Sequence, residues 1–288
     1  MTQLPRIGVL GLGRLGTCLA RALHAAKLPL TAVASSHVSA AISFGQQLSA
    51  AVAAVPVERL HEHAELIFLS VPDARVTAAL SQLGIGAQHA VVHTSGALGL
   101  EALTPARTLG TGTGVFHPLQ AFARAAGPDR FHGIHVGIES ATEALALQLT
   151  AVAQQLGAHG FSLAGVDRAA YHAAAVFVSN YQVALHAAAA RAWSLAGLPP
   201  EAARAGLVPL AEGALRAIAE HELTDALTGP VARGDVATVE RHLAALAGDP
   251  ETLALYRALA EALLRLPLAL DADARARLAA ALGMPEGA

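Results

Sequence analysis

Three glycines near the start of the chain constrain its fold more than any other feature. Gly11, Gly13 and Gly16 are spaced as G-x-G-x-x-G, directly after an apolar run at residues 6–10 and at the start of a helical pattern at residues 12–26. In such a segment the first glycine permits a tight turn, the second lets a ligand approach the backbone, and the third lets the helix pack closely. The motif therefore predicts the first strand–turn–helix unit of a Rossmann fold.

Strand-like and helix-like segments alternate over the first 165 residues. Apolar runs predict strands at residues 6–10, 30–35, 66–71, 90–94, 115–117 and 134–138, with helical spacing between them. This alternation predicts an α/β fold with a doubly wound parallel sheet. Beyond about Gly165 only helical patterns follow, broken at residues 197–200, 229–234, 248–250 and 267. We therefore expect a Rossmann-like NAD(P)-binding domain over residues 1–165 and an all-α domain over residues 166–288.

The glycine loop predicts a dinucleotide site, because the free N–H groups of a helix N-terminus bind a pyrophosphate. The residues expected to hold the cofactor are Gly11, Leu12, Gly13, Arg14, Leu15, Gly16, Ser35, Ser36, Val71 and Pro72. The carboxylate that usually follows the second strand in NAD-binding proteins is missing, since the chain reads Ala-Ser-Ser-His at residues 34–37. Serine donors in its place favour NADP, with NAD as the alternative. A degenerate Rossmann domain without a ligand is the remaining interpretation.

Three more loops follow predicted strands at the edge where open α/β sheets carry functional groups. Asp73, in the first loop, is expected to cap the next helix. The second offers the hydroxyl and amide groups of Thr94, Ser95 and Gly96 to a substrate carboxylate, with a simple turn as the alternative. In the third, His117 precedes a proline and can act as a general acid or orient a carbonyl, unless its role is structural.

The helical half adds two candidate positions. His172 and Asn180 lie on one predicted helix face, where a buried Asn180 amide would need a partner in the substrate, the nicotinamide or another helix. Arg233 stands in a loop bounded by glycines and is a candidate carboxylate clamp. Asp235 is expected to cap the following helix.

Composition narrows the partners and the setting. With 19 Lys and Arg against 22 Asp and Glu, the charge favours no nucleic-acid partner. Residues 169–190 lack charged side chains over a length that could span a membrane, but their alanines and polar residues favour a buried helix and no membrane. A single cysteine, Cys18, and the absence of a signal-peptide pattern predict a cytoplasmic protein. His132 and His135 have metal-like spacing without a nearby third ligand, so we predict no metal site.

Six segments together resemble one bacterial family. They read GLGRLG, SVPDARV, VVHTSGA, VFHPLQAF, YHAAAVFVSNY and LTGPVARGD, and the resemblance runs from about residue 5 to about residue 265. This family combines a Rossmann-like domain with the helical domain DUF2520. It resembles the pyrroline-5-carboxylate reductases, ketopantoate reductases, F420-dependent NADP reductases and β-hydroxyacid dehydrogenases, whose helical domain is of the 6-phosphogluconate dehydrogenase C-terminal type. The resemblance implies hydride transfer to a small carbonyl or imine, and a homodimer packed through the helical domain.

The chain departs from the relatives that use a helical-domain lysine as the acid. Lys27 is its single lysine and is predicted at the end of the first helix, so His117, His172, a serine or water must supply the proton. We assign the catalytic role to His117, His172 and Asn180, and substrate binding to Thr94, Ser95, Gly96, Asn180 and Arg233. The leading hypothesis is an NADPH-dependent reductase of a small 2-oxo acid such as ketopantoate. A cyclic-imine reductase and a non-catalytic NADP-binding sensor are the alternatives.

Overall fold

The computed structural model describes residues 4–123 and 126–285. The chain divides into two compact units, Met1–Ser179 and Asn180–Ala288, and each is described here by itself. The sequence predicts a domain boundary near residue 165, and the structure changes from strands to helices there, between Ser162 and Arg168. As a domain boundary, residue 165 stays a prediction.

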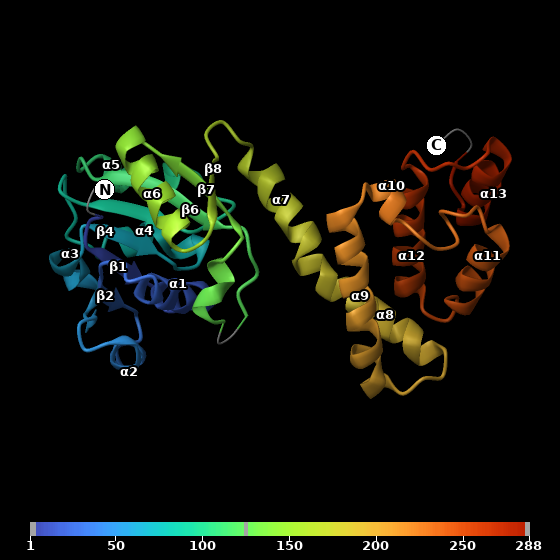
Figure 1. Ribbon diagram of the computed structural model, residues 1–288, viewed down its shortest axis with the longest axis horizontal. Coiled ribbons are helices and arrows are strands. Elements are labelled where there is room, and N and C mark those ends of the chain that lie inside the picture. Colours follow the sequence, from blue (N-terminus) through green and yellow to red (C-terminus); the bar gives the residue numbers. More distant parts are fainter. Residues whose placement is uncertain (1–3, 124–125, 286–288) are drawn as a thin grey trace. The chain divides into compact units, whose positions relative to one another are not determined.

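The first unit is built on a twisted sheet that is mostly parallel (Figure 1). In the described part of the chain its eight strands are β1 (Ile7–Leu10), β2 (Leu30–Ala34), β3 (Ala53–Ala54), β4 (Leu66–Leu69), β5 (Ala90–His93), β6 (Gly112–Pro118), β7 (His135–Ser140) and β8 (His159–Ser162). They lie in the order β3-β2-β1-β4-β5-β6-β7-β8. All six predicted strands are present. The sequence did not reveal β3 and β8, because one has two residues and the other lacks an apolar run.

One pair of strands departs from the parallel arrangement that the sequence predicted. Strand β7 runs antiparallel to β6, with His117 opposite Gly137, and β8 runs parallel to β7. A parallel neighbour would need a crossover connection, usually a helix. The described part of the β6–β7 connection contains only the short 3-10 turn η4 (Pro128–Phe131), so the chain turns back along the edge of the sheet.

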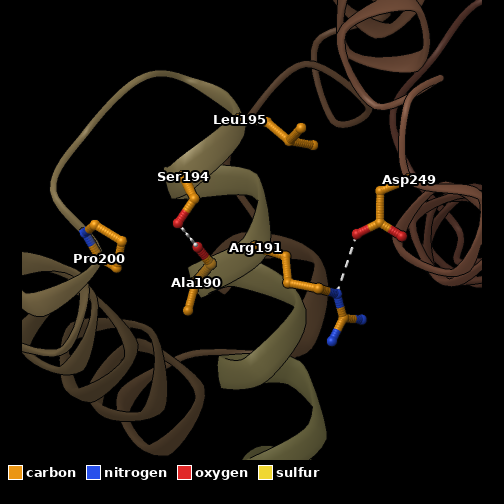
Figure 2. A pocket seen from close by; sticks show the side chains of 6 residues that line it. All are labelled: Ala190, Arg191, Ser194, Leu195, Pro200 and Asp249. Atoms are coloured by element: carbon orange, nitrogen blue, oxygen red, sulfur yellow. Dashed lines mark hydrogen bonds and ion pairs between the residues drawn. The ribbon is translucent and has the colours of Figure 1, made fainter.

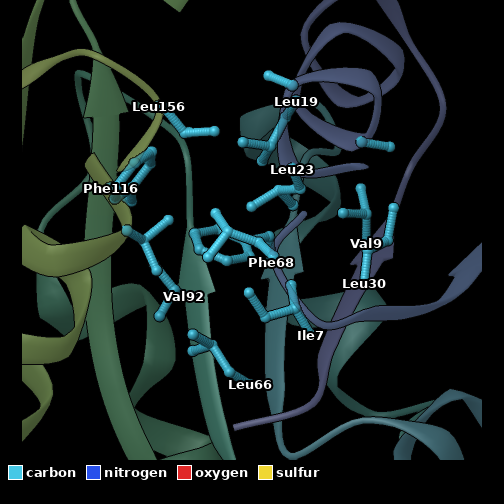
Figure 3. Packing of buried hydrophobic residues seen from close by; sticks show 14 of the residues in the cluster. Ile7, Val9, Leu19, Leu23, Leu30, Leu66, Phe68, Val92, Phe116 and Leu156 are labelled. Carbon is cyan, nitrogen blue, oxygen red and sulfur yellow. The ribbon is translucent and has the colours of Figure 1, made fainter. Parts of the chain in front are cut away.

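Two apolar layers cover the faces of the sheet. Helices α1 (Arg14–Ala25), α2 (Val38–Leu48) and α6 (Glu143–Gln155) pack on one face, and the short helices α3 (Leu60–His63), α4 (Val76–Leu80) and α5 (Thr104–Arg107) pack on the other. Alternate strand residues point to opposite faces, which is why Ile7 and Val9 enter the first layer while Leu10 enters the second. Phe68 and Phe116 meet edge to face at the centre of the first layer, with ring centroids 5.3 Å apart (Figure 3).

Residues 169–190 do not form the single buried helix that the sequence predicted. They belong to two helices, α7 (Arg168–Val178) and α8 (Asn180–Leu195), and the described part of α7 has no fully buried residue. The Ser179 hydroxyl donates to the Ala175 carbonyl oxygen at 2.7 Å, as Ser and Thr do where helices bend or end. Large apolar side chains of these helices, including Val178 (72% exposed) and Val183 (74%), remain uncovered. The many alanines make this segment apolar in sequence, but each alanine side chain buries little area.

The second unit is helical. It contains α8, the 3-10 turn η5 (Pro200–Ala202), α9 (Ala203–Glu220), α10 (Leu223–Ala226), α11 (Val236–Ala245), α12 (Pro250–Leu264) and α13 (Ala272–Leu282). Four of the breaks between these elements fall at the predicted positions, and a further break at residues 221–222, between α9 and α10, was not predicted. A small core that includes Val239, Leu264 and Leu278 holds the last three helices together. Within the described residues, none of the helices combines the length and apolarity that crossing a membrane requires.

Candidate functional site

The glycine loop has the geometry that its spacing predicts. Gly11 adopts φ +96°, a conformation that side chains disfavour, and a Cβ there would lie 2.3 Å from the Ser70 carbonyl oxygen. A Cβ on Gly16 would lie 1.8 Å from the Gly11 carbonyl oxygen, so only glycine lets α1 approach the turn this closely. Nothing lies within 4 Å of a Cβ built on Gly13. The loop is therefore tight on its protein side and open where a ligand would approach.

Helix α1 begins without a capping group. Gly13 occupies the N-cap position, no side chain accepts a hydrogen bond from the first turn, and that turn has no acidic residue. The first N–H groups of a helix need acceptors, and the helix dipole favours an anion there. The loop thus fits a pyrophosphate, and Arg14 is exposed beside it.

The end of β2 presents serine hydroxyls and no carboxylate. The Ser35 side chain is nearly buried, and its Oγ accepts a hydrogen bond from the His37 N–H at 3.2 Å, which leaves its own hydrogen free to donate. Ser36 and His37 are exposed. These groups are compatible with the 2′-phosphate of NADP, which a carboxylate at the same place would repel.

The predicted role of Asp73 as a helix cap is wrong. Pro72 precedes the 3-10 turn η2 (Asp73–Arg75), Arg75 precedes α4, and neither element has a side-chain cap. The polyproline-like backbone of Pro72 (φ −54°, ψ 145°) makes Asp73 the first residue of the turn. The Asp73 carboxylate instead lies close enough to His93 and His117 to counteract the lowering of both pKa values.

One loop, one strand end and one helix meet around His117. The Nδ1 atom of His117, on β6, lies 2.7 Å from the hydroxyl oxygen of Tyr171, on α7. A Cβ on Gly96 would lie 2.7 Å from His117 Nε2 and 2.9 Å from His172 Nδ1. The structure therefore brings together three predicted site residues, Gly96, His117 and His172, at the carboxyl ends of β5 and β6.

The His117 imidazole is neutral near pH 7. Burial, followed by the nearby His172 and Arg168, lowers its pKa to about 4. A neutral imidazole donates from one ring nitrogen and accepts at the other. The predicted role of His117, as a general acid or as a group that orients a carbonyl, stays a prediction. Burial also raises the pKa of its partner Tyr171.

Thr94 and Ser95 differ in where their hydroxyls point. Thr94 is buried, and its Oγ1 donates to the Leu69 carbonyl oxygen of β4 at 3.4 Å. Ser95 is half-buried, and its Oγ accepts hydrogen bonds from the N–H groups of Ala97 and Leu98, each at 3.1 Å. Thr94 therefore joins two strands, whereas the Ser95 hydroxyl hydrogen is free for a ligand.

Sequence reasoning missed Tyr171 and Arg168. Arg168, Tyr171 and His172 follow one another at helical spacing on α7, and Arg168 forms an ion pair with Glu139 of β7 at 3.3 Å. The Arg168 side chain is 11% exposed, and its nitrogens form no hydrogen bond with the described residues. Tyr171 stands directly before His172 in one of the quoted motifs, but its role depends on a contact with a residue 54 positions away.

Asn180 and Arg233 belong to the second, helical unit. Asn180 is the first residue of α8, so the break after Ser179 contradicts the prediction that His172 and Asn180 share one helix. Arg233 lines a surface pocket with Asp225, Thr228 and Pro267. Asp235 caps α11 as predicted, because its carboxylate accepts from the Thr238 N–H at 3.0 Å. The predicted roles of Asn180 and Arg233 in substrate binding stay predictions.

A second pocket of the helical unit holds none of the predicted residues. Arg191 Nε lies 3.1 Å from Asp249 and donates to Thr252 Oγ1 at 2.9 Å, beside Ser194 and Pro200 (Figure 2). The partly exposed ion pair ties α8 to the start of α12. Across the residues that the structure describes, no three His, Cys, Asp or Glu side chains are grouped to hold a metal ion.

The sheet and the glycine loop define a Rossmann-type fold with the loop geometry of a dinucleotide-binding motif. Two protein families match the chain: a Rossmann-like domain over residues 2–118 and the domain of unknown function DUF2520 over residues 134–263. The chain therefore combines a Rossmann-like N-terminal domain with a DUF2520 domain, as its motifs predicted. A comparison with curated proteins gives no match.

Solved structures support the same class. A Bacteroides fragilis protein proposed to be an NADP oxidoreductase is 27% identical, covers 90% of this chain and 98% of its own, and has a TM-score of 0.74. A Thermotoga maritima protein is 25% identical, with coverage of 89% and 97% and a TM-score of 0.72. The reductive aminase of Aspergillus terreus, solved with NADPH, cyclohexanone and allyl amine, is 16% identical, with coverage of 92% and 95% and a TM-score of 0.63. This last likeness concerns the fold alone.

Proposed function

We propose that the protein is an NADP(H)-dependent reductase of a small carbonyl substrate. The observation that carries this proposal is the placement of the His117–Tyr171 pair at the same sheet edge as the glycine loop. In open α/β sheets this edge is where cofactor and substrate meet. The likeness to the Bacteroides fragilis protein supports NADP as the cofactor.

Residues of the first unit would hold the cofactor. Gly11, Gly13 and Gly16 would surround the pyrophosphate, and Ser35 and Ser36 would face the 2′-phosphate. Val71 and Pro72 would line the nicotinamide side, because Val71 packs directly beside Gly11. The bound cofactor would supply a hydride to the substrate carbon.

Tyr171 is the candidate proton donor. When His117 Nδ1 carries the hydrogen, it donates to the Tyr171 oxygen and leaves the Tyr171 hydroxyl hydrogen free to face a substrate. The proton would pass to the substrate oxygen as the carbonyl carbon is reduced, so the product is an alcohol. Lys27 does not serve this purpose, because it follows the C-terminal end of α1, at the opposite edge of the sheet from the glycine loop.

A 2-oxo acid is the substrate class to test first, with ketopantoate as its first member. Gly96 and His172 adjoin the His117–Tyr171 pair, and Ser95 precedes Gly96 in the same loop. Asn180 and Arg233 are the candidates from the helical unit. A cyclic imine of the pyrroline-5-carboxylate kind is the second candidate, since the same hydroxyl can protonate a nitrogen and the single lysine is not available as the acid. A homodimer formed through the helical region is expected with either substrate.

The test is NADPH oxidation followed by absorbance with ketopantoate, other 2-oxo acids and cyclic imines, each repeated with NADH. We expect turnover with a 2-oxo acid and a preference for NADPH. Turnover with imines alone would select the second candidate. NADPH binding without turnover across the panel would contradict the reductase proposal and favour a sensor.

Matched variants test whether residues of the helical unit bind the substrate. Asn180→Ala and Arg233→Ala should each raise KM if these residues bind the substrate, while Arg204→Ala, another arginine of the helical unit, should not. If Asn180→Ala and Arg233→Ala both leave turnover unchanged in folded protein, the helical unit contributes neither residue to the site.

A further inference from the structure

His93, at the carboxyl end of β5, connects the two ends of a short loop. Its ring is fully buried. The Ser95 N–H donates to Nδ1 at 3.2 Å, and Nε2 lies 3.0 Å from the Gly99 carbonyl oxygen. A carbonyl oxygen only accepts and an N–H only donates, so these two contacts require the neutral tautomer with its hydrogen on Nε2.

Further hydrogen bonds fix the rest of the loop. The Gly99 N–H donates to Glu101 Oε1 at 2.9 Å, and the N–H groups of Ala97 and Leu98 donate to Ser95 Oγ. Burial is the main cause of the lowered pKa of His93, which agrees with a neutral ring. The segment from residue 94 to residue 99 is therefore held in one conformation by side chains, without belonging to a helix or strand.

Two hydrogen-bond donors of this loop remain unused. Ser95 Oγ already accepts two N–H groups, so the Ser95 O–H can only donate outward, and the Gly96 N–H forms no hydrogen bond within the described residues. Gly96 adjoins His117 and His172, because a Cβ built on it would lie within 3 Å of both rings. Among the charged groups nearby, Arg168 lowers the pKa values of His93 and His117, Asp73 raises both, and Glu101 raises that of His93, so the loop itself supplies the donors on which this site depends.

We propose that His93 is a positioning residue that holds the Ser95 O–H and the Gly96 N–H as a paired donor site for a substrate carboxylate. This inference rests on the proposed function, because it names the anionic group of the same substrate. His93 touches neither substrate nor cofactor. It acts by holding the loop, and the loop binds one or both carboxylate oxygens.

A second histidine provides a matched control. His89, just before β5, forms the same kind of bridge: its Nδ1 accepts from the Gly86 N–H at 3.0 Å and its Nε2 lies 3.0 Å from the His61 carbonyl oxygen. It is also nearly buried, with 7% exposure. Because it lies at the opposite end of β5, His89→Leu removes an equivalent bridge away from the proposed site.

The first experiment measures the tautomer in wild-type protein. In a ¹H–¹⁵N spectrum of the ¹⁵N-histidine-labelled protein at pH 7, the resonances missing from His93→Gln identify His93. We expect a neutral ring with its hydrogen on Nε2. A hydrogen on Nδ1, or on both nitrogens, overturns the proposal, and this result does not depend on how any variant folds.

The second experiment uses oxamate, an unreactive carboxylate analogue of a 2-oxo acid, added to the NADPH-saturated protein. We expect oxamate to shift the Ser95 and Gly96 amide signals, and His93→Leu to weaken oxamate binding at least tenfold while leaving NADPH affinity within twofold. His89→Leu should leave oxamate affinity within twofold. Unshifted Ser95 and Gly96 signals, or equal losses in His93→Leu and His89→Leu, overturn the proposal.

These readouts separate the two proposals. Oxamate binding at Ser95 and Gly96 without turnover of any substrate would contradict the reductase and leave the carboxylate site standing. Turnover of a 2-oxo acid with the same KM in wild type and His93→Leu would contradict the role of His93 and leave the reductase standing.

Discussion

The Tyr171 hydroxyl oxygen lies 2.7 Å from His117 Nδ1 and joins helix α7 to the end of strand β6. Their rings also meet edge to face, with centroids 5.4 Å apart. The sequence predicts His117 as a site residue at a strand end, but it does not predict that Tyr171 contacts it. Because His117 is neutral near pH 7, the pair carries no net charge. The hydrogen bond to His117 fixes the position of the Tyr171 hydroxyl group.

Removing that hydroxyl tests its role directly. We expect Tyr171→Phe to lower kcat about 100-fold or more, since general acid catalysis contributes roughly 10² to 10⁴ in rate. NADPH affinity should change little, whereas the free energy of unfolding should fall by about 1 kcal/mol or more, because the half-buried His117 loses its hydrogen-bond partner. The measurement is steady-state NADPH oxidation with the best substrate of the panel. Unchanged kcat would exclude Tyr171 as the donor, and Tyr256→Phe in the helical unit serves as the control.

The lowered pKa of His117 predicts a loss of stability in acid. The unfolded chain takes up a proton as the pH falls below about 6.5, whereas the folded ring resists protonation until about pH 4. The stabilising contribution is fully present above pH 6.5 and declines toward pH 4, by about 2 to 3 kcal/mol between pH 7 and pH 4.5. Urea unfolding at both pH values should show this loss in wild type and not in His117→Gln. Equal losses in the two proteins would rule out His117 as its source.

The open space around Gly13 allows a substitution that separates folding from cofactor binding. Gly13→Asp fits the observed backbone (φ −75°, ψ −164°) and places a good N-cap residue at the start of α1. We expect unchanged or raised stability, by up to about 1 kcal/mol, together with at least tenfold weaker NADPH binding because the carboxylate repels the pyrophosphate. Fluorescence titration and thermal unfolding measure the two effects. Gly13→Ala is the control for size, and full NADPH affinity in Gly13→Asp would contradict the assigned phosphate site.

Lys27 has an unfavourable backbone conformation. It adopts φ +56° after the last turn of α1, where the Leu28 N–H donates to the Leu23 carbonyl oxygen at 2.9 Å. Glycine is the usual residue at such a helix end, and a left-handed conformation costs other residues about 1 kcal/mol. Lys27→Gly should therefore raise the free energy of unfolding by about 0.5 kcal/mol after the entropy cost of glycine. Lys27→Ala retains the strain and should give no gain in the same chemical denaturation experiment.

The exposed apolar side chains of the helical region predict self-association. Leu210 on α9 is 70% exposed, and Val183 on α8 is 74% exposed. Exposed apolar clusters usually mark interaction surfaces. Light scattering at micromolar concentration should give a dimer, and Leu210→Glu should shift it toward monomer, with the exposed Ala214→Glu as the control for charge. A monomeric wild-type protein would contradict the expected homodimer.

The sequence determined the elements whose signals are local. The glycine spacing depends on the close approach of Gly16 to Gly11, five positions earlier. The apolar runs predict six strands because each strand must bury at least one face. Four of the helix breaks and the Asp235 cap also follow from neighbouring residues. Such features were predicted correctly because their energetic causes lie within a few positions of one another, or repeat with the period of one element.

The tertiary structure alone decided the rest. The reversal of β7, the burial of His93 and the meeting of Gly96, His117 and Tyr171 depend on contacts between segments that are far apart in the chain. Burial in turn sets the charge of His117, since removing water disfavours the protonated ring. The exposure of α7 was mispredicted for the same reason: whether an apolar helix is covered depends on its neighbours in space. The sequence thus determined where the loops stand, and only the packed structure decided which side chains face one another and in which protonation state.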